Sequence, residues 1–192
     1  MAKFFGNLHL VLVVGVLASL AVMFGVSADT VSGSSVLRWV HTLVGILWIG
    51  LLYYFNFVQI PTMPKIPAEL KPGISKHIAP SALFFFRWAA ALTVLIGLAV
   101  AVHPGPGAPS YLVEALTLQD PYKLIGVGMW LALIMAFNVW FIIWPNQKKA
   151  LGLVEADDAS KAKAATTAMM TSRLNTLLSI PMLYAMVNFN GG

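Results

Sequence analysis

Apolar residues fall into five runs, each long enough to cross a lipid bilayer as a helix. A hydrocarbon core about 30 Å thick needs about 20 consecutive apolar residues. Of the 192 residues, 59% are apolar and 10% are charged, whereas soluble domains carry about 25% charged residues. The sequence therefore predicts an all-α integral membrane bundle that forms a single domain, residues 1–192. The five predicted spans are Asn7–Ala28, Val36–Ile60, Pro80–Val102, Pro121–Trp144 and Thr166–Asn188.

The first run has two interpretations. Lys3, the apolar residues after it and the small residues before Asp29 are typical of a cleaved signal peptide. The apolar run is longer than the core of such a peptide, so we interpret it as a first transmembrane helix.

Basic residues predict the orientation of this helix bundle. Lys3 and the second and fourth connections hold eight of the twelve lysines and arginines. By the positive-inside rule, the N-terminus is cytoplasmic and the C-terminal Asn190-Gly191-Gly192 is outside. Orientation also accounts for the formal charge of +5, so we expect the lipid bilayer, and no nucleic acid, as a partner.

Polar residues inside the spans lie at two depths. His41, His103 and Lys123 lie near the outer face, and four residues lie nearer the cytoplasmic face. The inner set is Arg87, Asn138, Arg173 and Asn175. All seven carboxylates are in loops or at span ends, and an uncompensated charge in the bilayer is costly. The two arginines are therefore predicted to reach the headgroups or to bind an anionic ligand.

His41 is the candidate iron ligand of a haem. At helical spacing it shares a face with Gly45, Trp48, Leu52 and Phe55. Gly45 leaves room beside the histidine for a flat group, and a neutral imidazole is a common haem ligand. The chain has no cysteine, so covalent c-type attachment is excluded. The prediction is a non-covalent haem b whose propionates point inward to the arginines. The alternative is a core histidine bonded to a neighbouring helix.

The other candidates have simpler interpretations. His103 begins a Pro/Gly-rich turn, so it is either a second iron ligand or a solvated loop histidine. Lys123 is either a group lining the substrate side or a lysine that snorkels to the interface. His9 and His77 are interpreted as interfacial.

Several stretches resemble the transmembrane N-terminal domain of membrane-bound urate oxidases (urate hydroxylases). They are Trp39–Gly50 with Tyr54–Phe57, Ala82–Trp88, Thr93–Gly97, Asn138–Gln147 and Ser172–Pro181. Full-length members continue into further helices and a cytochrome c domain. This sequence stops at Gly192 and has no Cys-x-x-Cys-His, so we expect it to lack that electron exit.

A more distant resemblance is to integral-membrane protoporphyrinogen oxidases. Their haem-ligating His and Trp and their functional Lys imply roles for His41, Trp48 and Lys123. Their Arg-x-x-Asn-x-x-Pro-like segment is only partly matched by Arg173, Asn175 and Pro181.

Together these features predict a haem-binding redox protein of the bacterial cytoplasmic membrane. Its electron partner would be a cytochrome c or a quinone, with partner subunits or a homo-oligomer. The alternative is a non-catalytic accessory subunit of a larger membrane complex. The predicted cofactor site comprises His41, Gly45, Trp48, Arg87, His103, Asn138, Arg173 and Asn175, with His41 and His103 as iron ligands and Lys123 as the candidate catalytic residue.

Overall fold

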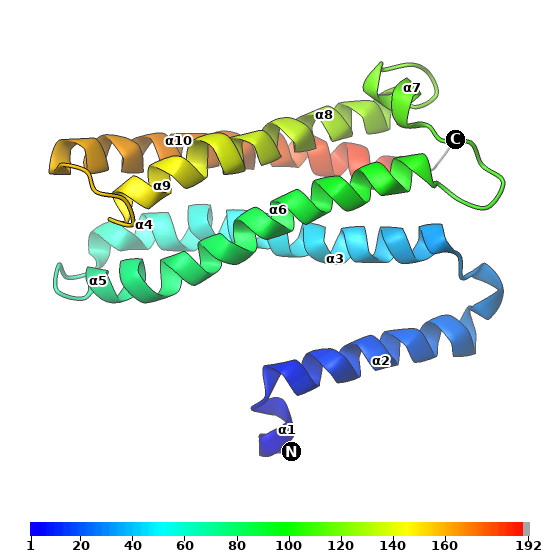
Figure 1. The fold of residues 1–192 in the computed structure, drawn as a ribbon, viewed down its shortest axis with the longest axis horizontal. Helices are drawn as coiled ribbons and strands as arrows, with labels where there is room; N and C mark the ends of the chain where they lie inside the picture. The colour runs from blue at the N-terminus through cyan, green and yellow to red at the C-terminus, as the bar shows by residue number, and fades with distance from the viewer. Residues whose placement is uncertain (190–192) are drawn as a thin grey trace.

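Four long helices lie side by side in the computed structural model, which describes residues 1–189 (Figure 1). The C-terminal residues 190–192, predicted to lie outside the membrane, are not among the described residues. The first long helix is α3 (Gly33–Tyr53), continued by η2 (Tyr54–Gln59), α4 (Ile60–Thr62) and η3 (Met63–Lys65). The second comprises α5 (Lys71–Gly73), η4 (Ile74–Ile78) and α6 (Ala79–Val102). The third comprises α8 (Lys123–Phe137), η5 (Asn138–Ile143) and α9 (Trp144–Ala150), and the fourth is α10 (Asp158–Asn188).

Side-chain caps start two of these helices. At the start of α3, the Ser32 hydroxyl accepts a hydrogen bond from the backbone N–H of Ser35. In return, the Ser35 hydroxyl accepts one from the backbone N–H of Ser32. Asp157 accepts a bond of 2.8 Å from the Ser160 N–H at the start of α10. This bond lowers the pKa of the Asp157 carboxyl below its usual value. The helix α10 therefore begins at Asp158, before Thr166, where the predicted span starts.

Three of the long helices extend beyond the predicted spans at one end. They contain 33, 32 and 28 residues, roughly 8 to 13 more than a 30 Å hydrocarbon core needs. The extra turns lie where α4, α5, α9 and the start of α10 meet (Figure 1). We call this the lysine end, because it carries Lys65, Lys71, Lys76, Lys148, Lys149, Lys161 and Lys163. The short helix α7 (Leu112–Leu116) lies at the opposite end, which we call the α7 end.

Helices of membrane-spanning length and apolarity overlap four of the five predicted spans. They are α2 (Leu8–Val26), Gly33–Lys65, Lys71–Val102 and Lys123–Ala150. The fifth predicted span lies within α10, which is long but is not among these apolar helices. The reason is that this span contains Arg173 and the polar residues Ser172, Asn175 and Ser179, the last three of which are buried against neighbouring helices.

Polar contacts attach α10 to the other helices, and apolar packing fills the space between them. Tyr53 Oη lies 3.0 Å from Ser179 Oγ, and Asn56 Nδ2 donates to Ser172 Oγ at 2.8 Å. Asn138 Nδ2 donates to Asn175 Oδ1 at 2.8 Å. Both asparagines that reach α10 in this way belong to π-helical segments, η2 and η5. Such segments often occur at functional sites, because the extra residue redirects side chains. The fully buried core around them includes Trp48, Leu52, Phe86 and Met135.

The helix α2 stands apart from the bundle (Figure 1). It follows the short helix α1 (Ala2–Phe5) and reaches α3 through η1 (Ala28–Thr30). None of its residues is buried, and its apolar side chains surround it on all sides. A helix that is apolar all round is stable only in lipid or against a partner. The first predicted span is therefore the least buried of the four apolar helices.

Candidate functional site

A cavity of about 950 Å³ lies between α3, α6, α8 and α10, toward the α7 end. Ligand sites in proteins have volumes of about 300–1,000 Å³ and are mostly apolar with a few polar groups. Here the apolar wall includes Ile49, Leu98, Met129, Met182 and Met186. The polar groups are Arg38, His41, Trp48 and Tyr111, and the threonines and glycines beside them are Thr42, Thr93, Gly45, Gly50 and Gly97.

His41 is fixed against α6 by one ring nitrogen. Its Nδ1 lies 3.0 Å from the carbonyl oxygen of Thr93. A carbonyl only accepts, so Nδ1 carries the proton and donates. Nε2 has no hydrogen-bond partner among the described residues. Metal-ligating histidines usually have this arrangement, with one nitrogen bonded to a carbonyl and the other free to bind the metal.

Gly97 makes room for the His41 ring. A Cβ at this position would lie 2.8 Å from His41 Cε1 and 3.2 Å from Nδ1, closer than van der Waals contact allows. Thr93 and Gly97 are on successive turns of α6, so the carbonyl that orients the ring and the gap that receives it come from one helix face. Both predicted interpretations of His41 are thereby compatible, because the histidine bonds a neighbouring helix and also lines the cavity.

Trp48 is fully buried, and its indole N–H has no acceptor. A buried donor left without a partner costs about 1–3 kcal/mol. Because Trp48 lines the cavity, a molecule with an acceptor atom in the cavity would offset that cost. Gly45, predicted to leave space beside His41, also lines the cavity.

Arg38 and Tyr111 line the cavity at the α7 end. Arg38 is exposed, and its Nη1 donates to the Pro104 carbonyl at 2.8 Å. Tyr111 is 7% exposed, and its ring stacks on Tyr122 with centroids 5.0 Å apart. Burial raises the pKa of the Tyr111 phenol, although the charge of Arg38 opposes this shift. The cavity therefore has a cation and a neutral hydroxyl at this end, both suited to an anionic or polar group.

Sequence reasoning missed Arg38, Tyr111 and the His41 partners on α6. Arg38 precedes His41 by three residues, so helical spacing places both on one face. That spacing was the available signal for Arg38. Nothing local in the sequence pairs His41 with Thr93 and Gly97, which lie more than fifty residues later.

The structure does not bring Arg87 to the cavity. Its guanidinium carbon lies 4.0 Å from the centroid of the Trp144 ring and 5.3 Å from that of Phe84. A cation over an aromatic face is stabilised electrostatically. Arg87 is only partly buried, and these rings are its partners among the described residues, whereas the sequence predicted that it reaches the headgroups or binds an anionic ligand.

Asn138 and Asn175 are bonded to each other instead of lining the cavity. Besides accepting from Asn138, Asn175 donates through Nδ2 to the Met135 carbonyl at 2.9 Å. Asn175 is fully buried, and Asn138 is 6% exposed. Their amide groups join α10 to η5 and α8 by hydrogen bonds between helices, which satisfy polar groups in an apolar interior.

Three more predicted residues are exposed and lie outside the cavity. His103 directly follows the last residue of α6, Lys123 is the first residue of α8, and Arg173 lies on the outward face of α10. Helix ends and outward faces project side chains away from a bundle interior. The predicted second iron ligand and catalytic lysine are therefore not placed beside His41.

The fold and the cavity define a class: a helical bundle with several helices of membrane-spanning apolarity and a large, mostly apolar cavity between them. Residues 110–190 match the family model described as urate oxidase N-terminal. The predicted family resemblance is thereby confirmed for the segment from α7 to α10. No curated protein and no solved structure matches the chain. His41 and Trp48 lie before the matched segment, whereas Tyr111, Met129 and Met182 lie within it.

Proposed function

We propose that this chain is a multi-pass membrane protein that holds one haem b non-covalently in the cavity and acts as a redox module. The observation that carries the proposal is the geometry of His41. One ring nitrogen is bonded to a backbone carbonyl, the other is free, and the ring lines a cavity large enough for a cofactor. The family match to the N-terminal region of urate oxidase supports an oxidoreductase context.

The cavity residues fit such a group chemically. His41 Nε2 would bind the iron, and the Thr93 carbonyl would hold the ring in one orientation. Haem supplies one-electron chemistry at its iron, tuned by the axial ligand, nearby hydrogen bonds and burial.

The other polar groups of the cavity would hold the edges of the cofactor. The Trp48 N–H would donate to an acceptor atom, and the apolar wall would exclude water. Arg38 would pair with the anionic edge, in place of the arginines nearer the lysine end. The propionates would therefore point toward the α7 end, opposite to the direction that the sequence suggested.

As a redox module, the protein would either oxidise a small substrate or pass electrons to a partner such as a cytochrome c or a quinone. The second candidate function is a non-catalytic accessory subunit in a larger membrane complex. The bare apolar surface of α2 favours contact with another subunit. This surface is compatible with both functions, since a redox module also works beside partner subunits or as a homo-oligomer.

Haem content of the purified protein tests the proposal. After expression with added haem precursor, the protein in mild detergent is expected to show a haem absorbance band. A chemical haem assay is expected to give about one haem per chain, since one histidine lines the cavity. Well-folded protein with no haem under these conditions would contradict the proposal and favour the accessory subunit.

We place the chain in the bacterial cytoplasmic membrane with five spans, counting α10, the N-terminus inside and the C-terminus outside. The lysines gathered at one end support this orientation. In an otherwise unchanged chain, Lys71→Cys is expected to resist an impermeant thiol reagent in intact cells, whereas Ser110→Cys is expected to react. The native chain has no cysteine, so it serves as the unlabelled control. Labelling of position 71 from outside would reverse the orientation.

A further inference from the structure

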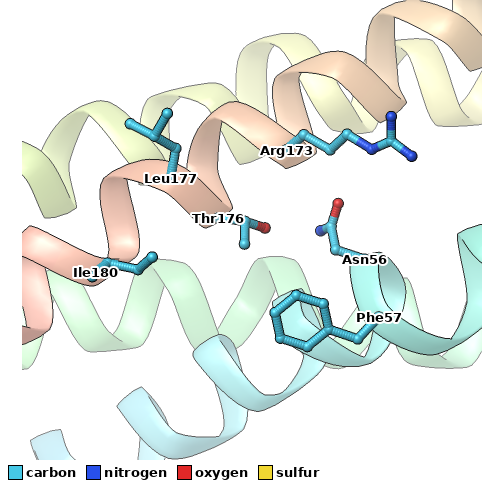
Figure 2. Close-up of a pocket in the computed structure, with 6 residues that line it drawn as sticks. All are labelled: Asn56, Phe57, Arg173, Thr176, Leu177 and Ile180. Atoms are coloured by element: carbon cyan, nitrogen blue, oxygen red, sulfur yellow. The ribbon is translucent and has the colours of Figure 1, made fainter.

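A second, smaller pocket lies on the side of the bundle, between η2 and α10. Its volume is about 420 Å³, and it is separate from the cavity beside His41, sharing none of its lining residues. The lining residues are Asn56, Phe57, Arg173, Thr176, Leu177 and Ile180 (Figure 2). We infer that this pocket binds one glycerophospholipid, with the phosphate at Arg173, a hydrogen-bond donor of the headgroup at Asn56 and an acyl chain over the apolar wall.

Asn56 supplies a buried acceptor without a partner. Its Nδ2 donates to the Leu52 carbonyl at 2.9 Å and to Ser172 Oγ at 2.8 Å. Its Oδ1 has no donor, although the residue is only 9% exposed. Figure 2 shows the amide facing α10, with the oxygen on the side of Arg173. A bound molecule that donates a hydrogen bond here would offset the cost of burying an unpaired oxygen.

Arg173 supplies a cation without an anion. The one ion pair among residues 1–189 joins Lys161 and Asp158, so no described carboxylate neutralises Arg173. Its side chain extends away from Ile180 (Figure 2), which is the direction of the lysine end because α10 begins there. A long cationic side chain in a bilayer reaches toward the headgroups in this way.

Apart from Thr176, whose hydroxyl donates to the Ser172 carbonyl, the rest of the pocket is apolar and exposed. Phe57, Leu177 and Ile180 are 65%, 62% and 66% exposed. They lie on the side of the pocket away from the guanidinium (Figure 2). The pocket therefore has a polar part toward the lysine end and an apolar part toward the middle of the bundle. This is the order of headgroup and acyl chain in a lipid leaflet.

A phosphate suits Arg173 better than a neutral group does. A guanidinium presents a fork of N–H donors that matches phosphate oxygens and adds charge to the hydrogen bonds. Phosphatidylglycerol has the phosphate and also hydroxyl donors for Asn56 Oδ1. Phosphatidylcholine has the phosphate but no donor in its headgroup. Phosphatidylglycerol also carries a net negative charge, whereas phosphatidylcholine is a zwitterion, so a preference for phosphatidylglycerol reports the charge at Arg173 and the donor at Asn56 together.

This inference rests on the membrane location in the proposed function and is independent of haem. The test is native mass spectrometry of the purified protein in detergent, titrated with phosphatidylglycerol or with phosphatidylcholine of the same chain length. Wild-type protein is expected to retain phosphatidylglycerol preferentially. Arg173→Gln is expected to weaken phosphatidylglycerol binding about tenfold, the effect of losing one charge-assisted hydrogen bond. Haem absorbance, read on the same samples, is expected to stay unchanged.

Lys163→Gln is the matched control, since it removes the same charge from the same helix but lies outside the pocket. It is expected to bind phosphatidylglycerol as the wild type does. Arg173→Lys keeps the charge without the fork and is expected to bind with intermediate affinity. Retained binding in this variant would show that replacing Arg173 does not by itself unfold the pocket, so that a loss in Arg173→Gln reflects the missing charge. Equal retention of both lipids, unaffected by Arg173→Gln, would overturn the inference. Preferential retention of a long-chain benzoquinone over phosphatidylglycerol would also overturn it.

Discussion

Replacing His41 with alanine is expected to abolish haem binding, so that the purified variant loses the haem absorbance band. His41 is the only histidine that lines the cavity among the described residues, and a neutral imidazole is a common ligand of haem iron. The measurement is the absorbance spectrum and haem content at matched protein concentration.

His9→Ala and His77→Ala are the histidine controls, because α2 and η4 hold these residues away from the cavity. Both variants are expected to keep the wild-type spectrum. A His41→Ala protein with full haem content and an unchanged spectrum would remove the basis of the haem proposal and leave the accessory subunit.

A glycine pair tests the same geometry without removing the histidine. Gly97→Ala would place a Cβ 2.8 Å from His41 Cε1, so the ring must move. We expect a shifted band or lower haem content. Gly50→Ala also adds a methyl group to a cavity-lining residue, but its Cβ would have no atom within 4 Å. This variant is expected to match the wild type. Identical spectra for both variants would argue against His41 as the iron ligand.

Asn175→Ala is expected to destabilise the bundle by about 1–3 kcal/mol. The substitution removes the acceptor of Asn138 and the donor to the Met135 carbonyl, at a residue that is fully buried. Interhelical hydrogen bonds in membrane proteins contribute about 0.6 kcal/mol on average. The larger expected value here reflects two lost bonds and a stranded donor on Asn138. Unfolding by sodium dodecyl sulfate in mixed micelles would measure the change.

Asn188→Ala is the control for this variant, since it changes an asparagine in the same helix whose one side-chain bond is local, to Tyr184. Little change in stability is expected from it. If Asn175→Ala were as stable as Asn188→Ala, the asparagine pair would contribute nothing to helix association, and α10 would be held by apolar packing alone.

Local chemistry determined much of this protein from the sequence. The apolar runs predicted the long helices, because a bilayer crossing requires a minimum length of apolar residues whatever the partners. The lysine-rich connections were predicted to share one side, and they lie at one end of the bundle (Figure 1). His41, Gly45 and Trp48 were selected by their common helix face, and all three line the cavity. Residues within two or three turns of one helix have a fixed relation in space, so the pattern alone was sufficient.

Only the tertiary structure decided which distant residues meet them. The partner of His41 is a backbone carbonyl, at Thr93, which no side-chain pattern records. The sequence predicts similar depths in the membrane for Arg87 and Arg173. In the structure, Arg87 lies over the ring of Trp144, whereas Arg173 lines a pocket on the side of the bundle. Asn138 and Asn175 bind each other because π-helical turns and helix packing bring them within 2.8 Å. These differences depend on the rotation of each helix about its own axis, which is set by packing between helices and not by the apolar content of any one of them.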